Sequence, residues 1–167
     1  MAPMLCFSYG SNMSHRRIQA RVPSARFVAV AELPAHRLSF HKSAGDGSAK
    51  CDAEETGNPD DRVIGVVYEI AIAEKPDLDQ HEALGFGYEE KQVELAAGGD
   101  RLRAWMYYAT RINNALKPFH WYKDHVLIGA RENGLPAEYI AQIEAVESID
   151  DPKPERHGRE LSIYGKS

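Results

Sequence analysis

Residues 62–72 form the most strand-prone segment of the chain and constrain its fold more than any other stretch. Their sequence, RVIGVVYEIAI, is rich in the β-branched and aromatic residues that favour strands. Shorter runs of apolar residues at alternate or successive positions precede it at residues 4–9, 26–33 and 36–41. The first half of the chain therefore predicts several strands that surround a buried central one.

The segments that flank this central run differ from each other. Residues 88–95 and 102–108 alternate in polarity and predict a hairpin across the glycine-containing turn at residues 97–100. Residues 43–61 are small, polar and rich in glycine, which predicts a loop. A loop of that length inside a domain is usually functional or mobile.

Helices are expected in two places between these strands. Residues 14–21 predict a short helix with Ser14 as its N-terminal cap. Residues 76–84 predict a second short helix that Gly85 closes. Both helices directly follow predicted strands.

The C-terminal third changes from strand to helix periodicity. Residues 121–132 predict a helix that ends near Gly134, and Pro136 is well placed to begin the next one. The tail from Asp150 is polar and contains prolines, so it is expected on the surface. The order of elements predicts an α+β fold with mostly antiparallel strands, which can curl into a barrel, and helices packed outside.

Length and charge bound the class of protein. A chain of 167 residues fits a single domain over residues 1–167, with a polar tail from about residue 150. Its net charge of −5 argues against a nucleic-acid partner, because such domains usually carry a basic stripe. The N-terminus lacks the features of a secretory signal, and no apolar run approaches the ~20 residues needed to span a membrane, so no membrane partner is expected.

Two cysteines do not make a disulfide framework, and they predict a reducing, cytoplasmic compartment. Cys6 lies in an apolar run and is expected to be a small buried residue. Cys51 lies in the expected loop, and the sequence is compatible with either an inert or a reactive thiol there.

The segment FSYGSNMS, residues 7–14, places a glycine between a buried strand and a helix. Gly10 lets the backbone bend there and lets a ligand approach closely. Backbone N–H groups ahead of a helix point outward beside the positive end of its dipole, which suits a carboxylate or an oxyanion. Ser11 and Asn12 can add side-chain hydrogen bonds. From these residues alone, the segment can be interpreted either as a plain strand-to-helix turn or as a ligand-binding loop.

Glu82 falls in the last turn of the helix expected at residues 76–84, close to its negative end. A partly buried carboxylate in such a position is suited to proton transfer. The neighbouring Asp77 and Asp79 show that acidic residues are common here. A solvated surface role for Glu82 is therefore the alternative.

A metal site is not expected from the seven histidines. His36 and His41, like His120 and His125, are spaced five residues apart, which places the two rings on different sides of a strand or helix. No pair of cysteines accompanies them. A serine hydrolase is equally unexpected, because the chain has no G-x-S-x-G motif.

An aromatic cluster of Phe119, Trp121 and Tyr122 opens the helix expected at residues 121–132. Such residues commonly pack in a core. A tyrosine at the rim of a pocket can instead bury its ring and present its hydroxyl group to a substrate.

Four segments, in order along nearly the whole chain, resemble the γ-glutamylcyclotransferase family. FSYGSNM is similar to the family's substrate loop, and VIGVVYEI is similar to its central strand. LDQHE follows at the family's usual distance and carries its catalytic glutamate. YKDHVLIGARENGLPAEY is similar to the helix–turn–helix of the animal glutathione-pathway branch. The resemblance implies a small mixed barrel with surrounding helices.

The resemblance also implies roles for individual residues. Glu82 becomes the catalytic general acid and base. Substrate binding falls to the following residues: Tyr9, Gly10, Ser11, Asn12, Met13, Ser14, Tyr88 and Tyr122. The implied reaction is attack of the substrate's α-amine on its own γ-carbonyl, which releases 5-oxoproline and an amine. It requires no metal, nucleotide or other cofactor and no covalent intermediate.

Departures from the family pattern leave alternatives open. Many relatives have glycine after the catalytic glutamate, where this chain has Ala83, and residues 45–61 do not closely match the animal members. The leaving amine could be a free amino acid, a lysine side chain, a polyamine or an aminoglycoside-like compound. A non-catalytic γ-glutamyl-binding protein and a γ-glutamyl acyl transferase are the other hypotheses. The relatives suggest a homodimer.

Overall fold

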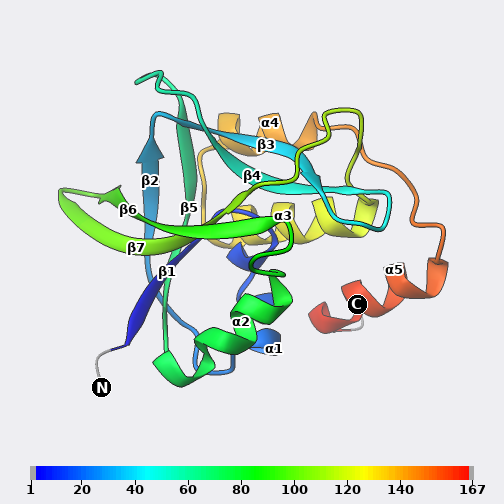
Figure 1. Ribbon diagram of the computed structural model, residues 1–167, viewed down its shortest axis with the longest axis horizontal. Coiled ribbons are helices and arrows are strands. Elements are labelled where there is room, and N and C mark those ends of the chain that lie inside the picture. The colour runs from blue at the N-terminus through cyan, green and yellow to red at the C-terminus, as the bar shows by residue number, and fades with distance from the viewer. Residues whose placement is uncertain (1–2, 166–167) are drawn as a thin grey trace.

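The computed structural model describes residues 3–165 (Figure 1). The strand-prone segment of residues 62–72 provides a strand of a closed barrel, with a neighbouring strand on each side. Strand β5 (Arg62–Ile70) pairs antiparallel with β1 (Met4–Ser8) on one side and with β2 (Arg26–Pro34) on the other. Its central residues are buried, because β-branched side chains pack well on a pleated surface covered on both faces. The strand prediction for this segment is confirmed.

The predicted hairpin closes the barrel. Strands β6 (Tyr88–Ala97) and β7 (Asp100–Ala109) pair antiparallel around a two-residue glycine turn. The strand order is β1-β5-β2-β6-β7, and a parallel pairing of β1 with β7 at Cys6 and Trp105 joins its two ends. The other neighbouring strands are antiparallel, so the expected α+β fold with a mixed, mostly antiparallel barrel is confirmed.

The prediction of a loop over residues 43–61 holds for residues 44–48 and 56–61 but is wrong for the residues between them. Strand β4 (Ala49–Glu55) lies there and pairs antiparallel with β3 (His36–Ser43) in a separate two-stranded sheet. The small residues that suggested a loop are instead packed: Cys51 and Ala53 are buried. Small side chains fit this strand because other elements pack closely against it.

The N-terminal helical region follows β1. A 3-10 turn, η1 (Ser11–Met13), leads into α1 (His15–Arg21), which confirms the predicted helix. Ser14 is its N-cap, as predicted, and its Oγ accepts a hydrogen bond at 3.3 Å from a backbone N–H of the first turn.

The second short helix follows β5. A 3-10 turn, η2 (Ile72–Glu74), leads into α2 (Lys75–His81), so the helix ends earlier than the predicted range of residues 76–84. Glu82 is its C-cap rather than a residue of its last turn, and its backbone N–H donates to a carbonyl of the preceding turn. The side chain therefore stands at the carboxyl end of α2.

The C-terminal third contains the predicted pair of helices. Helix α3 (His120–Glu132) packs on the η1 turn, and α4 (Ala137–Glu144) packs against α3. Gly129 permits the first of these contacts, because a Cβ atom there would lie only 2.6 Å from the backbone N of Ser14 and 2.7 Å from Cβ of Met13. The glycine brings the backbone of α3 directly onto the η1 turn.

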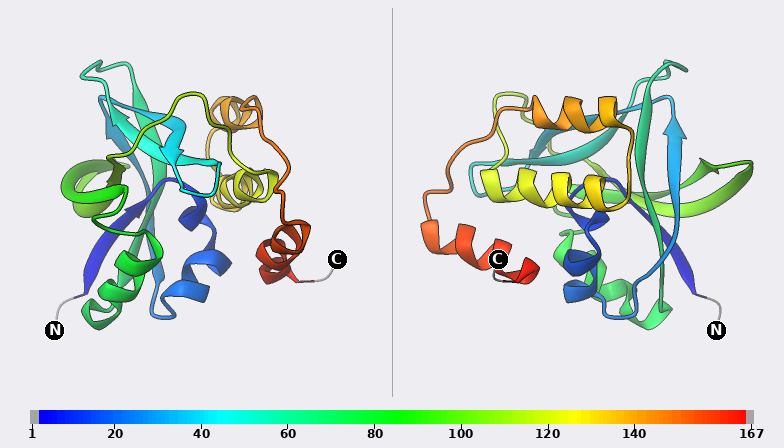
Figure 2. Two further views of the ribbon diagram at one scale, coloured as in Figure 1. Left: turned by 45° about the vertical axis from the view of Figure 1, so that its right-hand side comes forward. Right: turned by 180° about the vertical axis from the view of Figure 1, so that it is seen from behind.

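The polar tail from residue 150 is more ordered than expected. It contains α5 (Pro154–Leu161) and the 3-10 turn η3 (Ser162–Tyr164), which lie beside α3 and α1 (Figure 2). No residue of α5 is buried, so the tail lies on the surface as predicted. Its helical content was missed because the segment is polar and contains prolines, which favoured an irregular tail.

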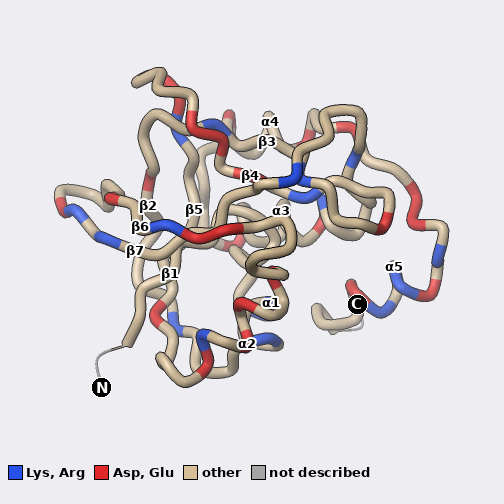
Figure 3. The backbone as a smooth tube through the Cα atoms, viewed as in Figure 1, with Lys and Arg blue, Asp and Glu red and all other residues tan. Residues whose placement is uncertain are grey.

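Charges of both signs are interspersed along the chain (Figure 3). Within residues 3–165 no helix is both long enough and apolar enough to cross a membrane.

Candidate active site

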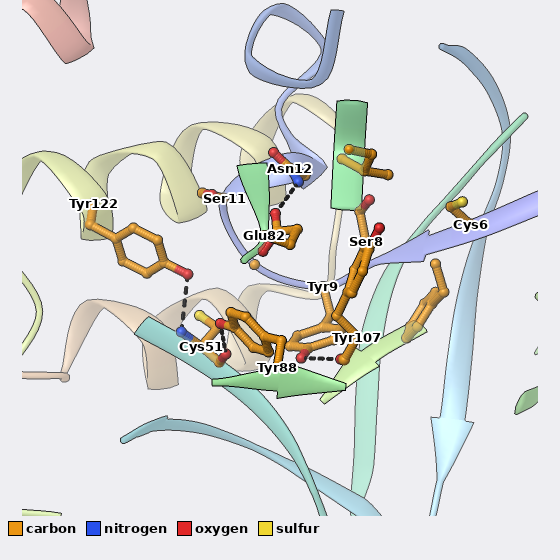
Figure 4. A pocket seen from close by; sticks show the side chains of 13 residues that line it. Cys6, Ser8, Tyr9, Ser11, Asn12, Cys51, Glu82, Tyr88, Tyr107 and Tyr122 are labelled. Carbon is orange, nitrogen blue, oxygen red and sulfur yellow. Dashed lines mark hydrogen bonds between the residues drawn. The ribbon is translucent and has the colours of Figure 1, made fainter. Parts of the chain in front are cut away.

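A pocket opens where β1 and the η1 turn meet β4, α2, β6, β7 and α3 (Figure 4). Its lining consists of the following residues: Cys6, Phe7, Ser8, Tyr9, Gly10, Ser11, Asn12, Cys51, Leu78, Glu82, Tyr88, Tyr107 and Tyr122. Six of the predicted substrate-binding residues and the predicted catalytic residue are among them. Segments far apart in the sequence thus converge on one cavity.

Four tyrosines form one wall of this pocket. The hydroxyl of Tyr9 donates to the carbonyl of Tyr107 at 2.6 Å, and that of Tyr88 donates to the carbonyl of Cys51 at 2.6 Å. The hydroxyl of Tyr122 accepts from the backbone N–H of Cys51 at 3.0 Å. Burial raises the pKa of Tyr9, Tyr88 and Tyr122 well above the usual range, so all three are neutral hydrogen-bonding groups.

Tyr122 differs from Tyr9 and Tyr88 in one respect. Because its oxygen accepts from Cys51, its own hydrogen stays available for a further acceptor. The ring is 4% exposed and its edge faces Phe40. The hydroxyl is thus held in place by the protein while its proton can turn to a ligand.

Residues 10–12 of the Tyr9–Asn12 loop form the opposite wall. As the first residues of a helical turn, Ser11 and Asn12 have backbone N–H groups without a partner inside that turn. Gly10 is required by close packing, because a Cβ atom there would lie 3.0 Å from Cβ of Cys51 and 3.2 Å from the Tyr122 hydroxyl. The loop can therefore present N–H groups to an anionic oxygen.

Glu82 contacts this loop directly. Its Oε1 accepts from Nδ2 of Asn12 at 2.7 Å and from Nη1 of Arg21 at 3.3 Å, and its side chain is 16% exposed. Two donors on one oxygen leave the other oxygen, Oε2, for a proton. Figure 4 shows the side chains of Asn12 and Glu82 pointing toward each other.

Asn12 carries an unused acceptor. Its Oδ1 is buried and has no hydrogen-bond partner among the described residues, while its Nδ2 is fixed on Glu82. A buried carbonyl oxygen without a donor is costly. A donor group of a ligand bound beside Glu82 can satisfy it.

Three cations interact electrostatically with the carboxylate of Glu82, and Arg21 is the one in direct contact with it. Besides Arg21, Lys42 and Lys50 lie close enough for Glu82 to favour their charged forms. Burial nevertheless lowers the pKa of both lysines, because it disfavours the ammonium ion. The Lys42 ammonium lies 4.6 Å from the ring centre of Tyr88, and that of Lys50 lies 5.9 Å from the ring centre of Tyr122. Glu82 is thus the one carboxylate in the described lining of the pocket, and cations rather than further carboxylates interact with it.

Met13 and Ser14 do not line the pocket, although substrate binding was expected of both. Met13 is 0% exposed in the core, and its carbonyl accepts from the hydroxyl of Tyr68 at 2.7 Å. Ser14 is also 0% exposed and caps α1. The structure places both residues behind the loop.

Several lining residues were missed from the sequence. Cys51 was assigned to a polar loop, but it is a buried strand residue, and burial raises the pKa of its thiol far above the usual range. Cys6 is buried as expected, and burial raises its pKa to about 12. Tyr107 lies in a predicted strand, but strand alternation alone does not say which face turns to α2.

The buried histidines have polar partners of their own. Nε2 of His41 lies 2.7 Å from a carboxylate oxygen of Asp52, and Nδ1 of His125 lies 2.6 Å from the hydroxyl of Tyr164. Among residues 3–165 no three His, Cys, Asp or Glu side chains gather in a way that could hold a metal ion.

Comparisons with known proteins agree with this arrangement. The model of the AIG2-like family matches residues 62–143. Human γ-glutamylcyclotransferase is 36% identical over 151 residues, which cover 87% of this chain and 80% of the human protein. The mouse γ-glutamylcyclotransferase is 34% identical, with coverage of 86% and 78%.

A solved structure named γ-glutamyl cyclotransferase superposes with a TM-score of 0.82 at 29% identity, covering 94% of this chain and 99% of the other. The resemblance seen in the sequence is thereby confirmed over most of the chain. The chain belongs to the γ-glutamylcyclotransferase family of enzymes.

Proposed function

We propose that this pocket cyclises γ-glutamyl compounds and releases 5-oxoproline and an amine. The contact between Asn12 and Glu82 carries the proposal, because it joins two segments 70 residues apart at 2.7 Å. One segment offers N–H groups for a developing oxyanion, and the other offers a carboxylate for proton transfer. Intramolecular acyl transfer needs both groups.

The proposed reaction begins with proton transfer from the substrate's α-ammonium group to Glu82. The amine then attacks the γ-carbonyl, a carbon–nitrogen bond forms, and the negative charge that develops on oxygen is stabilised by the loop N–H groups. As the original amide bond breaks, Glu82 returns the proton to the departing nitrogen. The ring nitrogen loses two protons in all and the leaving nitrogen gains two, so the amine leaves as an ammonium ion.

Ring closure requires a folded substrate more than a strong nucleophile. The tyrosine wall and residues 10–12 face each other across the pocket, so together they can hold the γ-glutamyl chain in its cyclic conformation. Holding reacting groups in the correct geometry can supply much of the catalytic effect. Tyr122 is suited to orient the substrate, because its hydroxyl is fixed by Cys51 and its proton is available.

The cations around Glu82 favour an anionic leaving portion. Arg21, Lys42 and Lys50 all lie near the Glu82 carboxylate, so a substrate with further carboxylate groups is attracted and a polycation is repelled. We therefore propose a γ-glutamyl amino acid as substrate rather than a γ-glutamyl polyamine or an aminoglycoside-like conjugate.

A panel of γ-glutamyl compounds tests the substrate class. We expect 5-oxoproline from γ-glutamyl amino acids, and a kcat/KM for γ-glutamyl polyamines that is lower by about a hundredfold, as for a loss of about 2.7 kcal/mol. Equal rates for the two classes would contradict the role given to Lys42 and Lys50. No 5-oxoproline from any member, with ligand binding retained, would favour a non-catalytic binding protein.

Glu82→Gln tests the catalytic role. Glutamine keeps the size and the hydrogen bond from Asn12 but cannot take up a proton, so we expect kcat to fall by about a thousandfold with substrate binding retained. Glu89→Gln is the matched control, because Glu89 is exposed on β6 and should leave kcat unchanged. Normal turnover by Glu82→Gln would exclude this role for Glu82.

The proposal extends to compartment and assembly. Cys6 and Cys51 are free, buried thiols, which is compatible with a reducing, cytoplasmic location. The family resemblance suggests a homodimer, and sedimentation of the purified protein tests this directly. A monomer at micromolar concentration would contradict it.

A further inference from the structure

Residues 151–164, which we call the C-terminal strap, are tied to the body of the protein by polar contacts. At its start, the carboxylate of Asp151 accepts from Nε1 of Trp121 at 2.8 Å and from Nη2 of Arg156 at 2.7 Å. No residue of α5 is buried. Leu161 of the strap packs against the core, and the contacts that Asp151 makes are polar.

The end of the strap reaches Arg17 of α1, whose side chain lies behind the Tyr9–Asn12 loop. Arg17 is 6% exposed, and its Nη1 donates to Oε1 of Glu160 at 2.6 Å. Its Nε donates to Oγ of Ser11 at 3.0 Å. The guanidinium carbon also lies 5.9 Å from the ring centre of Trp121. One buried cation thus connects the strap to a residue of the active-site loop.

A second contact holds the other end of the loop. The hydroxyl of Tyr164 donates to Oγ of Ser14 at 2.9 Å, and Nδ1 of His125 lies 2.6 Å from the same hydroxyl. Ser14 Oγ in turn caps α1 by accepting from the backbone N–H of Arg17. Between Ser11 and Ser14 the chain has only Asn12 and Met13.

Arg17 depends on Glu160 because it is buried. A buried guanidinium is costly unless a carboxylate and further acceptors offset its lost hydration. Glu160 is the carboxylate within hydrogen-bond distance of Arg17 among the described residues. Without its charge, Arg17 is expected to leave its buried position and to release Ser11.

We propose that Arg17 is a positioning residue for the reaction and that the strap, through Glu160, keeps it in place. Arg17 does not line the pocket. It acts through Ser11 on the backbone N–H groups of the loop and on Asn12, which orients Glu82. This inference rests on the proposed function for its effect on catalysis, but not for its effect on the loop.

Steady-state kinetics of single and double variants test the inference, using 5-oxoproline release well below the unfolding temperature. We expect kcat/KM to fall about tenfold to a hundredfold in Arg17→Gln and Glu160→Gln, since a ~1 Å displacement of a positioning group can cost about a hundredfold. The double variant should lose no more than Arg17→Gln alone, because Glu160 acts through Arg17. Glu155→Gln, at an exposed position of the same helix, is the matched control.

Unchanged kcat/KM in both folded single variants, or losses that simply multiply in the double variant, would overturn the inference. Tyr164→Phe provides a milder variant, which removes the hydroxyl contacts with Ser14 and His125 and is expected to lower kcat/KM by about threefold.

Hydrogen exchange separates this inference from the proposed function. In Glu160→Gln the backbone amides of residues 10–14 should exchange about tenfold faster than in the wild type, while those of β5 stay unchanged. This measurement needs no substrate. If the wild type releases no 5-oxoproline, the proposed function fails and the exchange rates still decide the role of the strap; unchanged exchange would overturn it.

Discussion

The two segments that meet in the pocket are held in opposite ways. The Tyr9–Ser14 segment is buried except at Gly10 and contacts α3, β5, β7 and the C-terminal strap. Gly129 lets α3 pack directly on its backbone. This wall of the site is fixed before any substrate arrives.

The segment that carries Glu82 has few such supports. It follows a helix of two turns, and the next residues include Ala83, Gly85 and Gly87 with φ angles of 51°, 86° and 130°. Phe86, between the two glycines, is 72% exposed. The side chain of Glu82 is placed chiefly by its contacts with Asn12 and Arg21 across the pocket.

This difference indicates how the site is organised. A preorganised loop positions charge-stabilising N–H groups without reorganisation during the reaction. A carboxylate that must take up and return a proton can instead be oriented from the loop side. The contact between Asn12 and Glu82 is where the fixed segment determines the position of the catalytic group.

Disturbing the packing of α3 on the Tyr9–Ser14 segment should have the largest effect, and the effect is on stability. In Gly129→Ala the added Cβ would lie 2.6 Å from the backbone N of Ser14, so we expect a loss of about 3 kcal/mol in unfolding free energy, measured by urea denaturation. Gly158→Ala is the control, because nothing lies within 4 Å of that position, and it should stabilise α5 slightly. Equal stability of the two variants would show that α3 does not hold the loop rigidly.

Breaking the contact between the two segments should affect catalysis next. Asn12→Asp places a second carboxylate 2.7 Å from Glu82, and this repulsion should lower kcat/KM by about thirtyfold, or about 2 kcal/mol. The exposed Asn58→Asp adds the same charge far from the pocket and should leave the rate unchanged. A rate for Asn12→Asp close to that of the wild type would mean that Glu82 is oriented without Asn12.

The stability that Glu160 of the strap contributes should depend on pH. Contact with His125 and the charge of Arg17 lower the pKa of Glu160 to about 2. The carboxylate therefore stabilises the folded state fully above the unfolded pKa of about 4.3, and this contribution is lost as pH falls toward 2. Glu160→Gln should thus cost about 1.5 kcal/mol at pH 7, a value reduced for solvent screening of a side chain that is 25% exposed.

Denaturant unfolding of the wild type and Glu160→Gln between pH 7 and pH 3 measures this difference. We expect the gap between the two proteins to narrow below pH 4. A constant gap over the whole range would exclude an ionic contribution from Glu160.

Relieving the backbone strain next to Glu82 should have the smallest effect, and the effect is on stability. Ala83 adopts a left-handed φ of 51°, which costs a non-glycine residue about 1–2 kcal/mol, so Ala83→Gly should raise the unfolding free energy by about 1 kcal/mol. Ala73→Gly, in the exposed η2 turn, should instead lower it by about 0.5 kcal/mol. Thermal unfolding of both variants measures the effect, and destabilisation by Ala83→Gly would contradict it.

Much of the fold could be predicted because local signals agreed with the tertiary structure. Ser14 caps α1 as its residue type and position indicate, and Gly134 takes the positive φ of 68° that favours glycine after a helix. The segment of residues 62–72 is strand-prone and is indeed buried between two neighbours. In these elements the local sequence preference and the tertiary packing favour the same secondary structure.

Other elements could not be predicted because their stability comes from distant partners. Strand β4 has a small, polar sequence, and Asp52 in its middle is buried only because His41 and a backbone N–H contact its carboxylate. Helix α5 is made mostly of polar residues and touches the core through Leu161, so its composition indicated a surface tail. Arg21, Lys42 and Lys50, which interact electrostatically with Glu82, come from three separate elements, and no motif connects them.

The position of Glu82 and the loop in one site could be predicted only from family resemblance. Each is ordinary by itself, since acidic residues surround Glu82 and a glycine turn often follows a strand. The contact of Asn12 with Glu82 depends on barrel closure, which no local pattern encodes. Conversely, Met13 and Ser14 matched the motif and yet lie behind the loop.

The pairing of β1 with β7 has a consequence for how the enzyme becomes active during folding. Strand β1 is made early in synthesis, yet its parallel partner at Trp105 follows only after about a hundred more residues, and Tyr164 follows Ser14 by 150. Contacts so distant in sequence form slowly, because a long loop must close before they contribute. Nascent chains in which the strap has not yet emerged would therefore hold an unfinished active site, and catalytic competence would be acquired only once Tyr164 can reach Ser14.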